Sequence, residues 1–116
     1  MQMSVPDNQY VQKPAVEIRE GVFRSMIYMK NLMLTVIDFT NGPWDEPEPP
    51  HSHPHEQISY IAEGELIFYC EGEDEKHLKE GDVFAVPSGK KHTVKVLTER
   101  VRIIDSFNPV REDFLK

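Results

Sequence analysis

The chain has 116 residues and a formal net charge of −7 at pH 7, which fits one domain with a buried core. The negative balance argues against a nucleic-acid partner, because phosphate binding needs a basic surface. No apolar run approaches the ~20 residues of a membrane-spanning helix, so no membrane partner is expected. The start, MQMSVPDNQYVQK, lacks the pattern of a signal peptide, and a single cysteine fits a reducing compartment. We therefore expect a cytoplasmic protein.

The apolar segments are short, rich in Val, Ile, Phe and Tyr, and separated by Gly and Pro, which is typical of strands. Residues 1–20 are polar and are predicted to form an N-terminal arm that either pairs with a partner subunit or stays loose. Residues 21–116 are predicted to form the folded domain with a short C-terminal tail. Its predicted strands cover residues 21–28, 31–40, 56–62, 65–70, 75–79, 82–86, 92–97 and 101–107. This pattern predicts an all-β single-domain sandwich or closed barrel of the jelly-roll class, and its open edges predict a homodimer.

The stretch NGPWDEPEPP, residues 41–50, is a long proline-rich loop that leads directly into HSHPHEQISY. Such a loop is either an exposed connector or a rim over a binding site, where Trp44 would supply an aromatic ring. The alternating histidines that follow indicate a metal site, a pH-sensitive surface strip or a merely polar loop. These alternatives differ in where the side chains point.

Side chains two residues apart on an extended chain share a face, and each such step advances about 6.6 Å. His51 and His53 can therefore reach one ion about 2.1 Å from each ring nitrogen. Gln57 lies too far along a straight strand to join them, so the chain has to bend, and Pro54 stands in that gap. We predict a loop that enters a strand, with converging polar side chains.

A second signal, GDVFAVPSGKKH, contains a tight turn, an apolar strand and a second turn before His92 opens the next strand. Together the two stretches resemble the paired motifs of the cupin superfamily. The first motif is filled in register by His51, His53, Gln57 and Gly64, and the second by Gly81, Pro87, Gly89 and His92. Gln57 stands where most cupins carry glutamate, Asp45 where the first motif begins with glycine, and Val96 where the second ends with asparagine. The resemblance covers roughly residues 30–108 and implies an RmlC-like jelly-roll barrel.

The resemblance also implies a metal site, because metal-binding cupins hold one divalent ion with the residues at these positions. The implied ligands are His51, His53, Gln57 and His92. The alternative is a purely polar pocket, since some relatives have lost the metal. An amide oxygen still ligates, and four neutral ligands leave the +2 charge uncompensated, which suits Lewis-acid chemistry on an anionic substrate. Such ligands suit Zn, Ni, Mn or Fe, so the sequence does not fix the identity of the metal.

Three further residues are assigned simpler roles. His55 shares the alternation but falls outside the motif register, so we expect it beside the site or at its rim. His77 lies in the charged segment EDEKHLKEG and is expected on a solvated strand face. Cys70 lies in the apolar run LIFYC, where a buried, inert thiol is expected.

The last strand and its exit read VRIIDSFNPVREDFLK. Alternation places one face of the strand toward the core, with Val101, Ile103, Asp105 and Phe107. An inward Asp105 would be a carboxylate in a partly apolar barrel, where desolvation raises its pKa toward that of a general acid or base. The alternative is a structural aspartate bonded to a basic side chain or a backbone turn. Arg111 either folds back to clamp a carboxylate or forms a surface salt bridge.

HSHPHEQISYIAEGEL together with DSFNPVREDFL is similar to the small KdgF-type pectin-degradation cupins. That resemblance implies linearisation of 4,5-unsaturated monouronates, released by pectin and alginate lyases, to 4-deoxy-5-keto uronates. It implies a small anionic sugar as substrate and a catalytic pocket formed by Asp105, Phe107 and Arg111. The chain reads SFNPV where many relatives carry an FSPP-like turn, which leaves these three positions intact.

Two rival functions belong to other classes. One is a non-catalytic sugar- or metabolite-binding cupin, in which the pocket is occupied but no bond changes. The other is a redox cupin, a dioxygenase or decarboxylase that uses Fe or Mn. Redox cupins typically keep the glutamate ligand or a bare three-histidine site, so Gln57 counts against this second rival.

Overall fold

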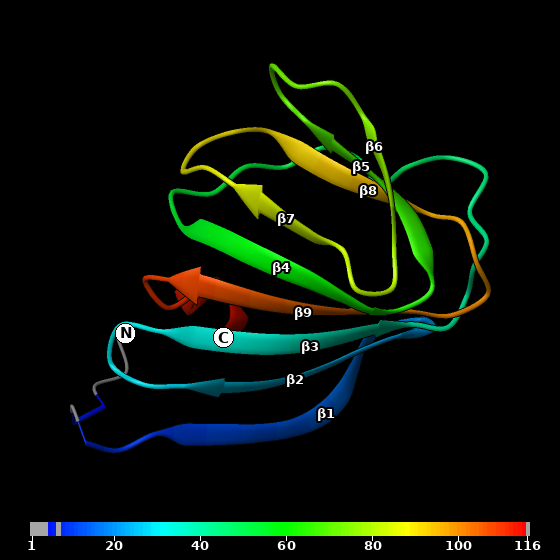
Figure 1. Cartoon of the computed structure of the whole chain (residues 1–116). Coiled ribbons are helices and arrows are strands. Elements are labelled where there is room, and N and C mark those ends of the chain that lie inside the picture. The colour runs from blue at the N-terminus through cyan, green and yellow to red at the C-terminus, as the bar shows by residue number, and fades with distance from the viewer. Residues whose placement is uncertain (1–4, 7, 116) are drawn as a thin grey trace.

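The computed structural model describes residues 5–6 and 8–115 and is built almost entirely from β-strands (Figure 1). In chain order the strands are β1 (Val11–Arg19), β2 (Val22–Tyr28), β3 (Met33–Phe39), β4 (Glu56–Glu63), β5 (Glu65–Cys70), β6 (Lys76–Lys79), β7 (Val83–Val86), β8 (His92–Val96) and β9 (Val101–Asn108). A short 3-10 helix, η1 (Glu112–Leu115), follows β9. Within the described residues no helix has the length and apolar character to cross a membrane.

The strands form two antiparallel sheets that pack face to face (Figure 1). The larger sheet has the order β1-β2-β3-β9-β4-β7, and the smaller has the order β6-β5-β8. Strand β9 pairs with β3 on one side and β4 on the other, so the last strand of the chain runs through the middle of the larger sheet. The fold is the all-β, single-domain jelly roll that the sequence predicts.

The space between the sheets has an apolar end and a polar end. Along β9 every second residue is buried, as predicted, from Val101 through Ile103 and Asp105 to Phe107. The apolar end receives side chains from both sheets, among them Val22, Phe39, Ile61, Leu66, Phe68, Phe84, Val96 and Val101. Burying aliphatic or aromatic side chains of this kind stabilises the fold by about 1.5–3 kcal/mol each. Toward the other end the buried residues Gln57 and Ser59 of β4 and Asp105 of β9 are polar, while Phe107 joins a second apolar cluster with Met26, Tyr28 and Met33.

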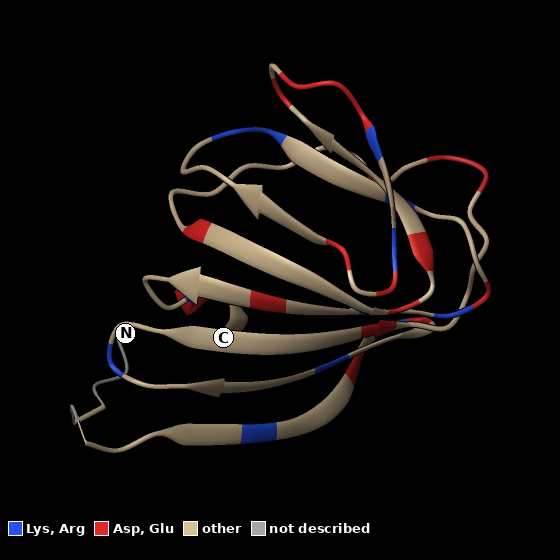
Figure 2. Cartoon of the chain, viewed as in Figure 1, with Lys and Arg blue, Asp and Glu red and all other residues tan. Residues whose placement is uncertain are grey.

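Ionisable side chains are distributed unevenly between the surface and the interior. The acid-rich segments 71–75 and 45–48 form exposed turns and loops (Figure 2). Among the described residues, the buried ionisable side chains apart from Cys70 and Tyr28 are His53, His92, Asp105 and Arg111. The net negative charge is therefore carried by the surface, and basic and imidazole groups outnumber carboxylates inside.

The eight strands predicted from the sequence are confirmed, each to within two residues at its ends. Strand β1 was not predicted: residues 11–19, part of the expected N-terminal arm, pair with β2 of the same chain. The segment VQKPAVEIR is exposed beyond its first residue, so it shows no alternation, and Pro14 falls at a register shift of this edge strand. Pairing of the arm with a partner subunit stays a prediction, and residues 1–4 and 7 lie outside the described part.

The turn between β4 and β5 requires glycine. Gly64 has a φ of +83°, in the left-handed region that side chains with a Cβ atom rarely adopt. A Cβ atom at this position would lie 2.1 Å from the backbone oxygen of Arg100. The chain therefore turns tightly after β4, and β5 passes directly into the smaller sheet.

Candidate active site

Three histidines converge at the polar end of the barrel. The ring nitrogens of His51, His53 and His92 offer one atom each, and these atoms lie within 4.8 Å of one another. The backbone of His51 pairs with that of His92 through two hydrogen bonds of 3.1 and 2.9 Å. This bridge anchors the end of the proline-rich loop to the start of β8. The expected convergence of His51 and His53 is therefore present, and the fold adds His92 from a distant strand.

Hydrogen bonds fix the proton positions on two of these rings. The Nδ1–H of His53 donates to the backbone oxygen of His55 at 3.0 Å, and the Nδ1–H of His92 donates to that of Lys90 at 2.9 Å. A carbonyl oxygen only accepts, so Nδ1 carries the proton in both neutral rings. Each Nε2 then keeps a free lone pair. This backbone support is typical of histidines that bind a metal.

Gln57 supplies a further oxygen at this cluster, because the chain bends after His53 as predicted. Its amide nitrogen donates to Ser59 Oγ at 2.9 Å and to Asp105 Oδ1 at 3.3 Å, which fixes the orientation of the amide. The amide oxygen Oε1 lies 3.1 Å from Nε2 of His53. Because Nδ1 carries the proton of the neutral ring, Nε2 of His53 and Oε1 of Gln57 are both acceptors with no proton between them. A cation bound by both atoms would remove the repulsion between their lone pairs.

The donor set therefore fits a divalent transition metal. Burial lowers the pKa values of His53 and His92, and it lowers that of His51 to about 4, with the neighbouring His92 and His53 adding to the effect. All three imidazoles are neutral at pH 7, as metal binding requires. Nitrogen and amide-oxygen ligands suit several first-row metals, so the site does not select one of them.

Asp105 is the buried carboxyl group of this region. It lies on β9 opposite Ser59 of β4, and its side chain is 5% exposed. The hydroxyl of Ser59 donates to Oδ1 at 2.5 Å. Desolvation raises the pKa of Asp105 to about 6, against the hydrogen bonds from Ser59 and Gln57, which lower it. The carboxyl is thus held by a hydroxyl and an amide, and its pKa lies close to neutral pH, as a group that exchanges protons requires.

Arg111 folds back into the barrel after β9. Its guanidinium lies 5.2 Å from the ring centre of Phe107 and 4.1 Å from that of Phe114. Its Nε and Nη2 atoms donate to the two carboxylate oxygens of Asp113 at 3.0 and 2.6 Å. The structure thus combines the two alternatives from the sequence, since Arg111 is buried and is also paired with a carboxylate. This fork leaves the Nη1 edge of Arg111 for a ligand.

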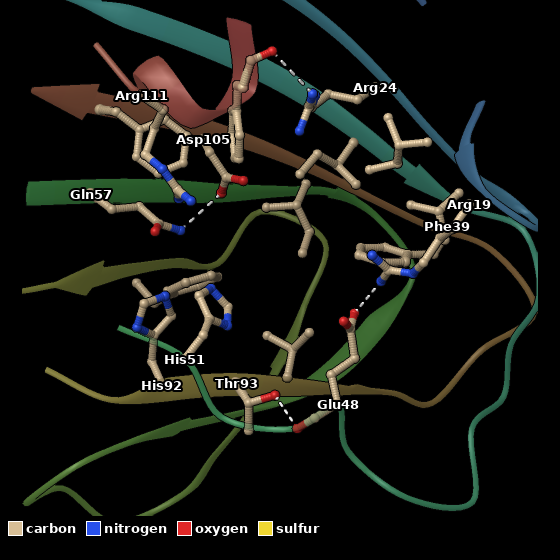
Figure 3. Close-up of a pocket in the computed structure, with 18 residues that line it drawn as sticks. Arg19, Arg24, Phe39, Glu48, His51, Gln57, His92, Thr93, Asp105 and Arg111 are labelled. Atoms are coloured by element: carbon tan, nitrogen blue, oxygen red, sulfur yellow. Dashed lines mark hydrogen bonds and ion pairs between the residues drawn. The ribbon is translucent and has the colours of Figure 1, made fainter. Parts of the chain in front are cut away.

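Of these groups, His51, His92, Gln57, Asp105 and Arg111 line one cavity of about 220 Å³ between the sheets, whereas His53 lies behind its wall (Figure 3). Figure 3 shows His51 and His92 at one side, with Gln57, Asp105 and Arg111 across from them. The apolar part of the wall includes Phe107 and Phe114. The volume lies below the ~300–1,000 Å³ of drug-sized pockets, which suits a ligand of the size of one sugar ring.

The remaining residues singled out in the sequence lie outside the cavity. Trp44 packs edge-on against Phe39 and donates its ring N–H to Asn41, so it supports the core and forms no rim. His55 contributes its backbone oxygen to His53 and places its ring 5.4 Å from that of His53. His77 is exposed, and the Cys70 thiol is buried, with its pKa raised by burial.

Sequence reasoning missed three side chains that complete the site. Ser59 supports Asp105, Asp113 holds Arg111, and Arg24 of β2 lines the cavity. Ser59 stands two residues after Gln57 on β4, so strand alternation could have placed it on the same inward face. Asp113 gives no such signal, because it follows the last strand and its contact depends on η1.

Comparison with known proteins agrees with this architecture. A family model described as a cupin domain matches residues 42–107, which is more than half of the chain. The chain belongs to the cupin family. This cupin is 35% identical over 106 residues to the pectin degradation protein KdgF of Dickeya dadantii (strain 3937), with 90% of this chain and 93% of the relative covered. The resemblance to KdgF-type cupins is thereby confirmed.

Solved structures show the same relationship. KdgF from Halomonas sp. superposes on this cupin with a TM-score of 0.76 and 29% identity, covering 87% of this chain and 92% of the other. An RmlC-like cupin from Shewanella frigidimarina gives a TM-score of 0.75 and 32% identity, covering 98% and 96%. The matches extend over nearly the full length of both chains, so they include both sheets and the cavity between them.

Proposed function

We propose that this cupin opens the ring of 4,5-unsaturated monouronates derived from pectin or alginate and yields the linear 4-deoxy-5-keto uronates. One observation carries the proposal: a buried carboxyl, Asp105, faces the same sugar-sized cavity as a cluster of histidine nitrogens and a guanidinium. The similarity to two proteins named KdgF, one of them a pectin degradation protein, supports the choice of substrate class.

The metal-binding residues in this proposal are His51, His53, Gln57 and His92. A bound divalent ion would act as a Lewis acid on a substrate oxygen, and the four neutral ligands would leave its charge uncompensated. The backbone carbonyls that accept from the Nδ1–H groups of His53 and His92 keep both Nε2 lone pairs directed at the centre.

The reaction is an isomerisation, so the protein has to move a proton without net gain or loss. The anomeric hydroxyl loses its proton, the bond from C1 to the ring oxygen breaks, and its electron pair goes to that oxygen. C1 becomes an aldehyde, the resulting enol at C5 becomes a ketone, and C4 gains a proton. Asp105 would carry the proton between these positions, while Ser59 and Gln57 hold its carboxyl in place.

The aromatic and basic residues would position the sugar. Phe107 forms a flat apolar wall beside Asp105 along β9, against which a sugar ring can stack. Arg111, held by Asp113, would place a positive charge near the substrate carboxylate. The open-chain product forms slowly without a catalyst, so modest acid–base and Lewis-acid assistance suffices.

The test is a turnover assay with a defined monomer. Metal-loaded protein is mixed with unsaturated galacturonate prepared by lyase digestion, and the ultraviolet absorbance of its conjugated double bond is followed against buffer alone. We expect faster loss of absorbance and a product with aldehyde and ketone signals in the NMR spectrum. Binding of the monomer with no acceleration over buffer would instead establish the binding-protein alternative, and oxygen uptake would establish the redox alternative.

A further inference from the structure

Arg24 is a basic residue of the cavity to which the proposed reaction assigns no role. It lies on β2, whose inward positions are otherwise occupied by Val22, Met26 and Tyr28. Its side chain lines the cavity, and Figure 3 shows it apart from Arg111, with Asp105 between the two arginines. An inward arginine on an apolar strand face is costly to the fold unless a partner compensates its charge.

The structure gives Arg24 almost no partner of its own. Its Nε is buried and has no hydrogen-bond partner, and its Nη2 donates at 3.4 Å, a long distance, to the backbone oxygen of Phe114. In the part of the chain that the structure describes, no carboxylate lies within ion-pair distance of Arg24, whereas Arg19, Arg100, Arg102 and Arg111 each have one. A half-buried guanidinium without a carboxylate partner is prepared to bind an anion.

The two guanidiniums around Phe114 differ in what they can offer. The guanidinium carbon of Arg24 lies 4.0 Å from the centre of the ring and that of Arg111 lies 4.1 Å from it. Asp113 occupies the Nε and Nη2 donors of Arg111. Burial lowers the pKa of Arg24, and the positive charge of Arg111 lowers it further, against the opposing effect of Asp113. This part of the cavity therefore has positive charge that no carboxylate pairs with, because the one hydrogen bond of Arg24 is the long contact to the backbone of Phe114.

We propose that Arg24 binds the carboxylate of the sugar acid and makes the cavity selective for acids over neutral sugars. The inference rests on the proposed function and deepens it, because it adds, to the positive charge that Arg111 places nearby, the residue that pairs directly with the substrate carboxylate. The two Nη groups of Arg24 can donate end-on to the two oxygens of a carboxylate. Phe114 packs against the guanidiniums of both Arg24 and Arg111 and so limits where each of them can lie.

The test compares binding of an acid and a neutral sugar that share a ring. Galacturonate and galactose are titrated by calorimetry into the metal-loaded wild type, Arg24→Gln, Arg24→Lys and the matched control Arg100→Gln. Arg100 is exposed and pairs with Glu63 at 3.8 Å, so its replacement removes the same charge away from the cavity. We expect Arg24→Gln to weaken galacturonate binding by about 10- to 100-fold and to leave galactose binding unchanged.

The lysine variant keeps the positive charge but not the paired donors of the guanidinium. Its affinity for galacturonate should therefore fall between those of the wild type and Arg24→Gln. If the glutamine variant does not fold, the lysine variant alone provides the test. Equal weakening of both sugars would mean that Arg24 only supports the fold, and would overturn the inference. So would unchanged galacturonate binding in both variants, or no preference of the wild type for the acid.

These results are separable from the fate of the proposed reaction. If the wild type opens unsaturated uronates but Arg24→Gln keeps the wild-type affinity for galacturonate, the reaction stands and the role of Arg24 is wrong. If the wild type opens none of them yet loses galacturonate selectively in Arg24→Gln, acid recognition stands and the reaction is wrong.

Discussion

Replacing Asp105 with asparagine should abolish activity and, in the metal-free protein, raise the stability of the fold. Burial raises the pKa of Asp105 from 3.8 to about 6. The native state therefore binds more protons than the unfolded state between these values, and the wild type loses stability as the pH rises through this window. At 1.36 kcal/mol per pH unit, the charged carboxyl costs the fold roughly 3 kcal/mol above about pH 6.

Asparagine removes this cost but introduces an NH₂ group that needs acceptors. Its oxygen still accepts from Ser59 and Gln57, as the carboxyl does. Thr35 stands opposite on β3 and offers a buried hydroxyl without a hydrogen-bond partner in the structure. An imperfectly bonded amide would cost about 1–3 kcal/mol. The difference is a net gain of about 0–2 kcal/mol at pH 8, which shrinks as the pH approaches 4.

The assay is urea unfolding in the presence of a chelator at pH 8, 6 and 4.5. Asp74→Asn serves as the matched control, because Asp74 is exposed in the turn before β6 and should give no gain at any pH. A variant Asp105→Asn that is less stable than the wild type at pH 8 would refute the reasoning. A gain that does not change with pH would refute it equally, because the effect would not come from the charge.

Three further predictions concern the histidines and the quaternary structure. The pKa of His51 is lowered to about 4, so the unfolded state binds more protons than the native state between about pH 4 and 6.5. The metal-free wild type should therefore lose more stability than His51→Gln as the pH falls through that window. Urea unfolding midpoints that change equally with pH in the two proteins would contradict this prediction. His53→Ala should lose both bound metal and turnover in elemental analysis and the absorbance assay, whereas exposed His77→Ala should keep both. The homodimer predicted through an edge strand should sediment as a dimer at micromolar concentration, and a monomer alone would contradict it.

Local sequence patterns were sufficient for most of the fold and for the histidine cluster. Alternation along β9 correctly placed Asp105 and Phe107 inside, because period-two burial is a local property of a strand. The spacing of His51 and His53 and the break at Pro54 correctly indicated a bend that brings Gln57 back to the cluster. The resemblance to cupins supplied His92, which no local pattern connects to His51.

The features that the sequence did not reveal depend on contacts between distant segments. Strand β1 has no alternation, since its position at the sheet edge is set by backbone hydrogen bonds to β2. The pairing of Arg111 with Asp113 depends on how η1 turns after β9. Arg24 was detectable in principle, because it interrupts the inward apolar positions of β2, but its lack of a partner is visible only in three dimensions.

The most direct test of the central claim is the rate of ring opening of unsaturated galacturonate by metal-loaded wild type and by Asp105→Asn at equal metal content. The account predicts that the wild type exceeds the rate in buffer and that Asp105→Asn falls close to it while retaining its metal, because Asp105 is not among the proposed ligands. Equal rates for the two proteins would contradict proton transfer by Asp105. A wild type no faster than buffer would contradict the proposed reaction itself.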